Sequence, residues 1–219
     1  MRLYLSSYRL GDRPDLLVEL AGNGARTGVI TNATDFVGED AREAYYRNVY
    51  DPFAELRDHG FDAARLDLRD YFGRPEALAA HLATLDLVWA PGGNTFLLRR
   101  AMRQCGFDRV GIALIEQNKL VYGGYSAGAC VACPDLKGIH LMDEHERVTD
   151  GYDPEVIWEG LNLIPIHLVP HYDSNHAESE AAGRVAAWML DQAMPYRTMR
   201  DGDVLIRDAN GIRAYERNP

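Results

Sequence analysis

The stretch Gly123-Gly124-Tyr125-Ser126-Ala127-Gly128-Ala129 decides how this chain is interpreted. It follows the apolar run Leu120-Val121-Tyr122 and precedes Cys130-Val131-Ala132, which can be helical. Because small residues flank Ser126, the backbone can bend tightly there. The stretch therefore predicts a strand, a sharp turn with Ser126 at its apex, and a helix. A Gly-x-Ser-x-Gly sequence in that context is typical of a nucleophile elbow, so Ser126 is the first candidate for a nucleophile.

Segments with strand character alternate with segments with helix character as far as this elbow. The expected strands are 3–5, 27–31, 63–68, 85–90 and 120–122, and the expected helices are 14–20, 40–59, 75–83, 95–104 and 108–116. This alternation predicts an α/β fold with a mostly parallel sheet and helices on both faces. Active sites of such sheets lie at the carboxyl ends of the strands, where the loop 90–95 and the Ser126 elbow would meet.

The second half of the chain has a different pattern. It contains one long expected helix, 177–192. The expected strands are short, at 139–142, 163–169, 196–199, 203–207 and 211–215. The last two strands, joined through Asp208-Ala209-Asn210, predict a C-terminal antiparallel hairpin. We expect these strands to add an antiparallel edge to the parallel core. No repeat or linker divides the chain, so residues 1–219 are expected to form a single domain.

Composition narrows the classes of partner. The chain has 219 residues, is 47% hydrophobic and carries a formal net charge of −10. It shows no basic patch of the kind a general nucleic-acid binder needs, and Arg99-Arg100 is interpreted as a solvated helix surface. No apolar stretch reaches the ~18–20 residues that span a bilayer, and the first residues are too briefly apolar for a signal peptide. We expect a cytoplasmic protein without nucleic-acid or membrane partners.

The cysteines do not indicate a disulfide framework or a metal centre. There are only three, Cys105, Cys130 and Cys133, which is an odd and sparse number. Cys130 and Cys133 form a Cys-x-x-Cys, but a zinc site would need two further ligands nearby. We interpret both as buried small residues, and we expect neither a metal nor a cofactor.

A serine nucleophile requires a base and an acid that orients the base. Of seven histidines, His171 is the candidate base because it directly follows the expected strand 163–169 and so lies on the rim of the active site. For the acid, the residues leave two candidates. Asp173 lies two residues after His171, and Asp201 follows the expected strand 196–199.

The oxyanion formed in acyl transfer needs two backbone N–H donors. Ala127 offers one, and Gly92 or Gly93 offers the other if their loop lies beside the elbow; we favour Gly93. Gly92, Asn94 and Thr95 are then expected to contact the substrate. The alternatives are a tight strand-to-helix connection capped by Thr95, or a phosphate site at the helix start. The loop has neither Gly-x-Gly-x-x-Gly nor a Walker lysine.

Three stretches together resemble the peptidase E family of aspartyl dipeptidases, serine peptidases related to cyanophycinase. They are Gly92-Gly93-Asn94-Thr95-Phe96, Gly124-Tyr125-Ser126-Ala127-Gly128-Ala129 and Pro170-His171-Tyr172. The resemblance implies a fold related to class I glutamine amidotransferases, a flavodoxin-like arrangement of three layers. It also implies hydrolysis of small peptides, dipeptides with an N-terminal aspartate, by Ser126 and His171. Whether the chain forms a homo-oligomer stays open.

The chain departs from this family at two points. The family's acid is a glutamate in a Pro-Glu-Gly stretch, and the matching stretch here is Arg200-Asp201-Gly202, so the resemblance implies Asp201, with Asp173 as the alternative. The family also carries arginines after the histidine, which suit an acidic substrate. Within 177–184 only Arg184 is basic, so Arg184 is the candidate for a bidentate contact with a substrate carboxylate. Its other interpretation is a helix-surface charge.

Two other functions fit parts of the same pattern. An α/β-hydrolase esterase or amidase would run serine, acid, histidine, with Asp143, Asp150 or Asp153 as its acid. Its oxyanion loop, however, would lie farther upstream than Gly92-Gly93. A non-catalytic, amidotransferase-like binding protein would keep the pocket without turnover.

Overall fold

The apolar segments of the first half pair side by side in the computed structural model, which describes residues 1–218. The main sheet has the order β3-β2-β4-β5-β1-β8-β9. Its strands are β1 (Arg2–Ser6), β2 (Arg26–Val29), β3 (Asp62–Arg65), β4 (Leu87–Ala90), β5 (Val121–Tyr125), β8 (Val204–Asp208) and β9 (Gly211–Tyr215). The first five are parallel, whereas β8 runs antiparallel to β1 and β9 to β8.

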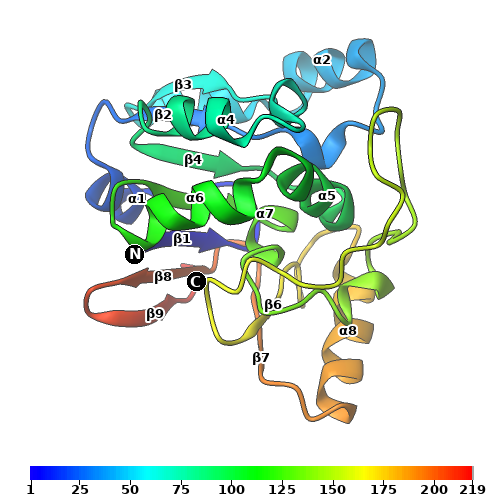
Figure 1. Cartoon of the computed structure of the whole chain (residues 1–219). Coiled ribbons are helices and arrows are strands. Elements are labelled where there is room, and N and C mark those ends of the chain that lie inside the picture. The colour runs from blue at the N-terminus through cyan, green and yellow to red at the C-terminus, as the bar shows by residue number, and fades with distance from the viewer. Residues whose placement is uncertain (219) are drawn as a thin grey trace.

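Helices cover both faces of this sheet (Figure 1). One face packs against α1 (Pro14–Ala21) and α3 (Pro52–Asp58), and the other against α4 (Pro75–Leu82), α5 (Thr95–Cys105) and α6 (Phe107–Glu116). Side chains alternate between the faces along each strand, so Leu3 and Leu5 lie in the core under α4–α6 while Tyr4 lies in the other. The predicted three-layer α/β fold with a C-terminal antiparallel hairpin is confirmed.

Glycines of the elbow allow the next helix to lie directly against the sheet. Gly124 pairs with both Ala90 of β4 and Leu5 of β1. A Cβ added to Gly128 would lie 1.9 Å from the Ala90 carbonyl oxygen. Since no side chain fits in that gap, glycine is required for α7 (Ala127–Cys130) to begin at the end of β5.

The second half contains a separate pair of strands. β6 (His167–Val169) and β7 (Tyr196–Thr198) form a two-stranded parallel sheet, connected by α8 (Ser179–Asp191). The predicted antiparallel addition to the core is thus confirmed for β8 and β9 and wrong for β6 and β7. A helix between two strands gives the chain the length it needs to return and run parallel. Met199 N–H extends the pairing by donating to the Val169 carbonyl at 2.9 Å.

Two predicted elements are wrong. The expected helix 40–59 is divided into α2 (Glu39–Asn48) and α3, because Pro52 disfavours a helical conformation at Asp51. Asp51 instead caps α3 by accepting a hydrogen bond from Phe53 N–H at 2.8 Å. The expected strand 139–142 is the 3₁₀ turn η3 (Ile139–Leu141). Two further 3₁₀ turns are η1 (Asn32–Thr34) and η2 (Leu68–Tyr71).

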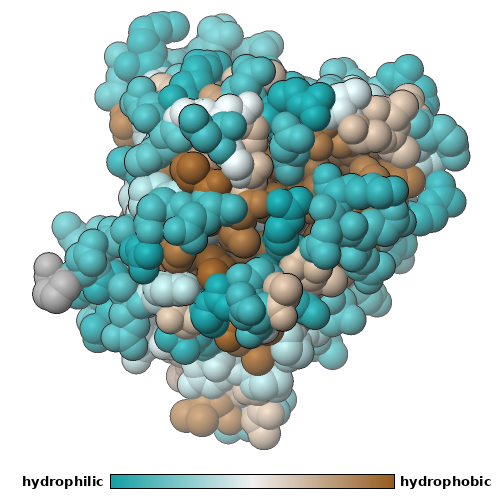
Figure 2. All heavy atoms as spheres, turned by 90° about the vertical axis from the view of Figure 1, so that its left-hand side faces the viewer, coloured by the Kyte–Doolittle hydropathy of each residue, from teal (hydrophilic) through white to brown (hydrophobic). Residues whose placement is uncertain are grey.

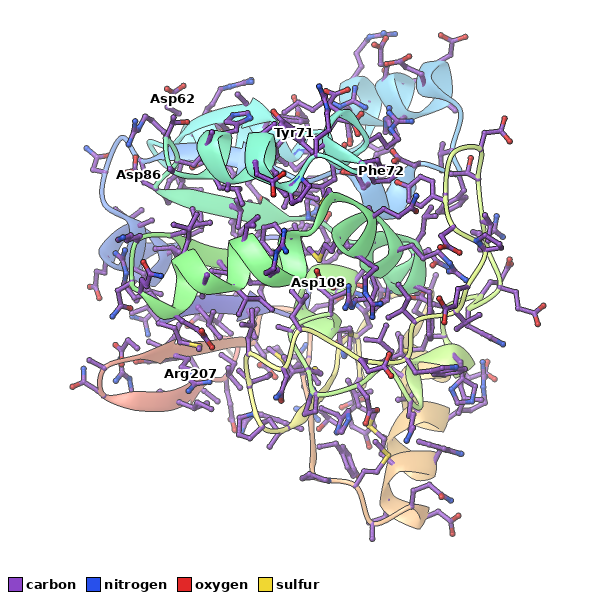
Figure 3. The ribbon with its side chains drawn as sticks, in the orientation of Figure 1. Asp62, Tyr71, Phe72, Asp86, Asp108 and Arg207 are labelled. Atoms are coloured by element: carbon purple, nitrogen blue, oxygen red, sulfur yellow. The ribbon has the colours of Figure 1, made fainter. Side chains whose placement is uncertain are left out.

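The interpretation of Arg99-Arg100 as a solvated surface is also wrong, because the side chains are 3% and 0% exposed. Arg99 pairs at 3.1 Å with Asp108, a residue of α6 that is labelled in Figure 3. The Arg100 guanidinium donates to four backbone carbonyls, those of His145, Arg147, Pro154 and Glu155. Arg99 Nε also donates to the Glu159 carbonyl at 2.8 Å, so both arginines attach a segment that has little regular structure to α5.

All three cysteines are buried and form no disulfide, and the predicted burial of Cys130 and Cys133 is confirmed. Leu168 N–H donates to Cys133 Sγ at 3.3 Å. Burial raises the pKa of the Cys133 thiol to about 12, so it stays protonated and unreactive at neutral pH.

The two ends of the parallel strands differ in character. Seen from the end at which these strands begin, the surface is mostly hydrophilic, and hydrophobic residues show mainly between hydrophilic ones (Figure 2). None of the helices within residues 1–218 is long and apolar enough to cross a membrane. The side chains with candidate chemistry gather at the opposite end, where the parallel strands finish.

Candidate active site

Ser126 occupies a sharp turn between β5 and α7. Its φ of 49° and ψ of −113° are uncommon for a residue with a side chain, and such backbone strain is concentrated at functional sites. The half-buried serine opens onto a cavity of about 380 Å³. The cavity is lined by Tyr8, Thr31, Thr34, Val37, Ala41, Arg42, Tyr45, Tyr46, Tyr50, Pro52, Pro91, Gly92, Gly93, Tyr125, Ser126, His171, His176 and Glu178.

His171 lines the same cavity and is held by a carboxylate from another loop. Its Nδ1 lies 2.8 Å from Asp201 Oδ1. Ser7 links the two residues, since its Oγ donates to Asp201 at 3.0 Å and accepts the His171 N–H at 2.8 Å. Burial would raise the pKa of Asp201, but the hydrogen bonds from His171 and Ser7 hold that pKa below its ordinary value. Asp201 is therefore a carboxylate at neutral pH and fixes the imidazole.

The other candidate acid, Asp173, pairs with an arginine and has no hydrogen bond to the histidine. Its side chain is 63% exposed and forms an ion pair with Arg200. A positive φ of 47° at Asp173, after one of 62° at His171, turns the chain sharply here. The structure thus brings Asp201, and not Asp173, to His171.

Ser126 and His171 face one cavity but are not hydrogen-bonded to each other in this structure. The second imidazole nitrogen, Nε2, lies 3.6 Å from Glu178 Oε2. Contacts between a nucleophile and its base are often long until substrate binds. Ser126, His171 and Asp201 are the types of residue that a serine hydrolase uses, and Nε2 is the imidazole nitrogen that Asp201 does not occupy.

The glycine loop after β4 lies directly against the elbow. A Cβ on Gly92 would lie 3.2 Å from Ser126 Cβ, and a Cβ on Gly93 would meet the Ala33 carbonyl oxygen at 2.6 Å. Gly93 also has a φ of 140°, which favours glycine. Among the described residues, neither Gly93 N–H nor Ala127 N–H donates to another group of the chain. Both amides are thus without an acceptor within residues 1–218, and their binding of an oxyanion stays a prediction.

Asn94 and Thr95 do not line the cavity, which corrects their expected contact with substrate. Both are buried, with Asn94 capping α5 through a 2.8 Å hydrogen bond from Leu97 N–H. Thr95 N–H donates to Asp143 Oδ2 at 2.8 Å. Their role here is to start α5 and so to fix the glycine loop; the cap is Asn94 rather than Thr95.

Arg184 lies on the exposed face of α8 and pairs with Glu180 at 2.9 Å. It does not line the cavity. An ion pair between residues four apart is typical of a solvated helix surface. The suggested contact of Arg184 with a substrate carboxylate is therefore corrected, and the surface interpretation holds.

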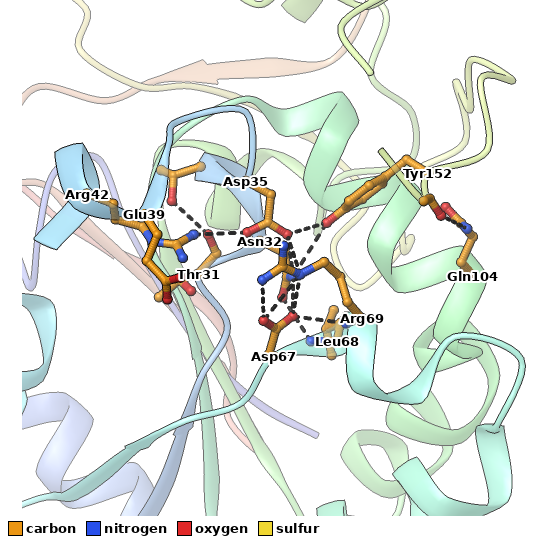
Figure 4. Close-up of polar contacts among 12 residues, drawn as sticks. Thr31, Asn32, Asp35, Glu39, Arg42, Asp67, Leu68, Arg69, Gln104 and Tyr152 are labelled. Atoms are coloured by element: carbon orange, nitrogen blue, oxygen red, sulfur yellow. Dashed lines mark hydrogen bonds and ion pairs between the residues drawn. The ribbon is translucent and has the colours of Figure 1, made fainter. Parts of the chain in front are cut away.

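A different arginine, Arg42 on α2, does line the cavity. It is 7% exposed, and its Nη1 lies 3.0 Å from the fully buried carboxylate of Asp35. Asp35 also accepts hydrogen bonds from Asn32 at 2.7 Å and Tyr152 at 2.5 Å (Figure 4). No hydrogen bond within residues 1–218 uses the other nitrogens of the Arg42 guanidinium. Asp35 thus fixes the Nη1 side of the guanidinium, whereas the other nitrogens can still donate hydrogen bonds to a ligand.

Sequence reasoning missed Arg42 because it lay within the expected helix 40–59, whose pattern does not show which side chains face a cavity. It also missed four tyrosines that line the same cavity, namely Tyr8, Tyr45, Tyr46 and Tyr50. A usable signal was present in Arg42-Glu43-Ala44-Tyr45-Tyr46, where an arginine and two tyrosines follow a loop at the carboxyl end of a strand.

One group of possible metal ligands occurs among the described residues: His171, His176 and Glu178, with ligand atoms within 4.8 Å of one another. The imidazole rings of His171 and His176 are stacked, with their centroids 3.7 Å apart and an angle of 7° between their planes. In-plane lone pairs of parallel stacked rings run side by side instead of converging on one ion, and His171 Nδ1 is already used by Asp201. The geometry does not favour a metal centre.

The acids that an α/β-hydrolase would use do not contact His171. Asp143 binds Thr95 N–H, and the Asp153 carboxylate accepts a hydrogen bond from Glu155 N–H at 3.0 Å. Asp150 is exposed. The site therefore has the order Ser126, His171, Asp201 along the chain.

A sequence model of peptidase family S51 matches residues 15–214. The chain belongs to peptidase family S51. An uncharacterised peptidase of Listeria innocua, Lin0382, is 32% identical over 140 residues, which cover 61% of this chain and 65% of that protein. Peptidase E of Citrobacter koseri is 32% identical over 93 residues, covering 42% and 37% of the two chains. A probable α-aspartyl dipeptidase of Drosophila melanogaster is 28% identical over 137 residues, covering 60% and 54%.

A solved structure has the same fold over its whole length. A 1.5 Å crystal structure from Listeria monocytogenes EGD-e, provisionally assigned to peptidase E, superposes with a TM-score of 0.79. The identity is 20%, and 99% of this chain and 98% of that chain are covered. The chain spans less than two thirds of the length of the curated S51 relatives described above.

Proposed function

We propose that this S51 protein is a serine dipeptidase that hydrolyses dipeptides with an N-terminal aspartate through an acyl-enzyme. One observation carries the proposal: Ser126 and His171 face one cavity, and His171 Nδ1 lies 2.8 Å from Asp201. The names of relatives, peptidase E and probable α-aspartyl dipeptidase, support the same class of substrate.

In the proposed reaction, Ser126 Oγ attacks the carbonyl carbon of the N-terminal residue. His171 Nε2 takes the hydroxyl proton and returns it to the leaving amine, and Asp201 holds the imidazole in the tautomer that this transfer requires. The free N–H groups of Gly93 and Ala127 bind the oxyanion. Water, activated by His171, then hydrolyses the ester and regenerates Ser126.

Arg42 supports the preference for an acidic side chain. It is the arginine of the cavity wall, and a guanidinium can bind a carboxylate with two hydrogen bonds. Asp35 fixes one side of Arg42, so the cation is already oriented before substrate arrives. We propose that Arg42 binds the side-chain carboxylate of the N-terminal aspartate, the role first assigned to Arg184.

One observation favours a second candidate, a binding protein without turnover. Ser126 Oγ and His171 are not hydrogen-bonded, and Glu178 lies beside the nitrogen that would take the proton. A peptide or amino acid would then occupy the cavity unchanged.

The two candidates differ in a panel of dipeptides with N-terminal Asp, Glu, Asn or Ala and a common second residue. We expect the wild type to release the second residue fastest from the Asp dipeptide. Ser126→Ala should lower kcat/KM by at least roughly 10⁴-fold, because the nucleophile is lost while the cavity stays. Amino-acid release is measured by chromatography, and circular dichroism checks folding. Activity of Ser126→Ala within tenfold of the wild type would rule out the serine mechanism.

A further inference from the structure

Glu178 is the cavity-lining acid that the proposed reaction does not use. It directly precedes α8, its side chain is 41% exposed, and its Oε2 lies 3.6 Å from His171 Nε2. That nitrogen is the one facing away from Asp201, and so the one that must exchange the serine proton. Glu178 therefore places a negative charge next to the reacting atoms.

The charges of the cavity wall leave Glu178 without a permanent cationic partner. Arg42 is paired with Asp35, and the neighbouring Glu180 is paired with Arg184. Among the ion pairs of residues 1–218, Glu178 meets only His171, which is charged only when protonated. A carboxylate that borders the reacting nitrogen without a permanent cationic partner is available to bind a cationic group of the substrate.

The covalent geometry of a dipeptide puts a positive charge within reach of this carboxylate. The α-nitrogen is two bonds, roughly 2.5 Å, from the carbonyl carbon that is attacked. During attack, the serine oxygen joins that carbon while lying about 3 Å from the nitrogen of its base. The α-ammonium group thus lies within roughly 7 Å of His171 Nε2, and Glu178 Oε2 is 3.6 Å from the same atom.

We infer that Glu178 binds the free α-ammonium group of the substrate and thereby restricts hydrolysis to the first peptide bond of a chain. This inference rests on the proposed serine peptidase function. Binding of the ammonium group gives Glu178 a partner other than His171, which leaves Nε2 free to accept the Ser126 proton. A peptide with a blocked amino terminus provides no such charge, and its bulk would also press against Glu178.

The test compares free with N-acetylated substrates, using Asp-Leu, N-acetyl-Asp-Leu, Ala-Leu and N-acetyl-Ala-Leu with release of leucine as the readout. We expect the wild type to prefer each free dipeptide by at least about 100-fold in kcat/KM, because the acetylated peptide loses a charge-assisted hydrogen bond and its added bulk presses against Glu178. Glu178→Gln should reduce that preference to below tenfold, mainly by raising KM for the free dipeptides. Glu178→Asp should retain part of it. Glu180→Gln, two residues along the same segment and paired outside the cavity, is the matched control and should keep the wild-type preference.

Three results would overturn the inference: equal hydrolysis of free and acetylated dipeptides by the wild type, an unchanged preference in Glu178→Gln, or an equal loss for both kinds of substrate. The last result would mean that Glu178 acts on His171 alone. Failure of the proposed function gives a different pattern, in which the wild type hydrolyses none of the four compounds and both proposals fall. Including Ala-Leu separates recognition of the amino group from recognition of the aspartate side chain.

Discussion

The two sides of the cavity are built in different ways. The catalytic side, Ser126, His171 and Asp201, lies on turns that follow β5, β6 and β7. The helical side, Arg42 with Tyr45, Tyr46 and Tyr50, lies on and just after α2, outside the sheet. Short sequence motifs predicted the residues of the catalytic side, because a sharp turn such as the one at Ser126 requires small neighbouring residues. Nothing local indicated the second, since a helix shows which residues share a face but not what that face covers.

The largest effect on catalysis is expected when the acid of the catalytic side is removed. Asp201→Asn keeps the size of the side chain but cannot hold the required tautomer of His171, so kcat should fall roughly 10³- to 10⁴-fold with Asp-Leu. Asp173→Asn is the matched control, and its kcat should stay within about twofold, since Asp173 pairs with Arg200 at the surface. Steady-state kinetics of the two purified variants makes the comparison. A larger loss in Asp173→Asn would reverse the assignment of the acid.

A second test addresses the helical side. Arg42→Gln should lower kcat/KM for Asp-Leu about 100-fold, mainly through KM, because the substrate carboxylate loses its cationic partner. Hydrolysis of Ala-Leu should change little, so the ratio between the two substrates reports on Arg42. Arg184→Gln leaves the cavity intact and should retain the wild-type ratio. An unchanged ratio in Arg42→Gln, in a folded protein, would exclude Arg42 as the specificity residue.

The smallest effect on catalysis is expected at Asp143, behind the glycine loop. Burial raises the pKa of Asp143 from 3.8 to about 6, more than the hydrogen bonds at Thr95 lower it. The folded state therefore holds this proton more tightly than the unfolded state. The wild type should lose stability as pH rises from about 4 to about 6, by about 2–3 kcal/mol. Asp143→Asn should lack this loss, because its amide oxygen still accepts from Thr95 N–H without charge.

Urea unfolding at several pH values measures this difference, with Asp150→Asn, at an exposed position, as the control. If the wild type and Asp143→Asn unfold with the same pH dependence, Asp143 does not carry a raised pKa. Activity at neutral pH should be nearly the same in both, because Asp143 contacts the start of α5 and not His171.

Where sequence patterns failed, long-range packing was the reason. Arg99 and Arg100 looked like surface charges, but the segment from His145 to Glu159 folds over α5 and supplies backbone carbonyl acceptors to both arginines. Residues 40–59 had helical spacing throughout, yet Pro52 separates two helices that pack differently. β6 and β7 were expected to extend the main sheet, but they pair with each other. The reason is that α8 carries the chain back to the start of β6, so that β7 runs parallel to it.

The sequence by itself determined the parallel core and the elbow, because alternating apolar residues and the glycines around Ser126 act over a few residues. It also placed His171 at the end of a strand and kept two acids as its partner. Only the tertiary structure chose between them, since the parallel pairing of β6 with β7 brings Asp201 to His171 across 30 residues. Tertiary packing likewise put Arg42 in the cavity wall and Arg184 outside it, because a buried partner, Asp35, fixes the first while solvent surrounds the second.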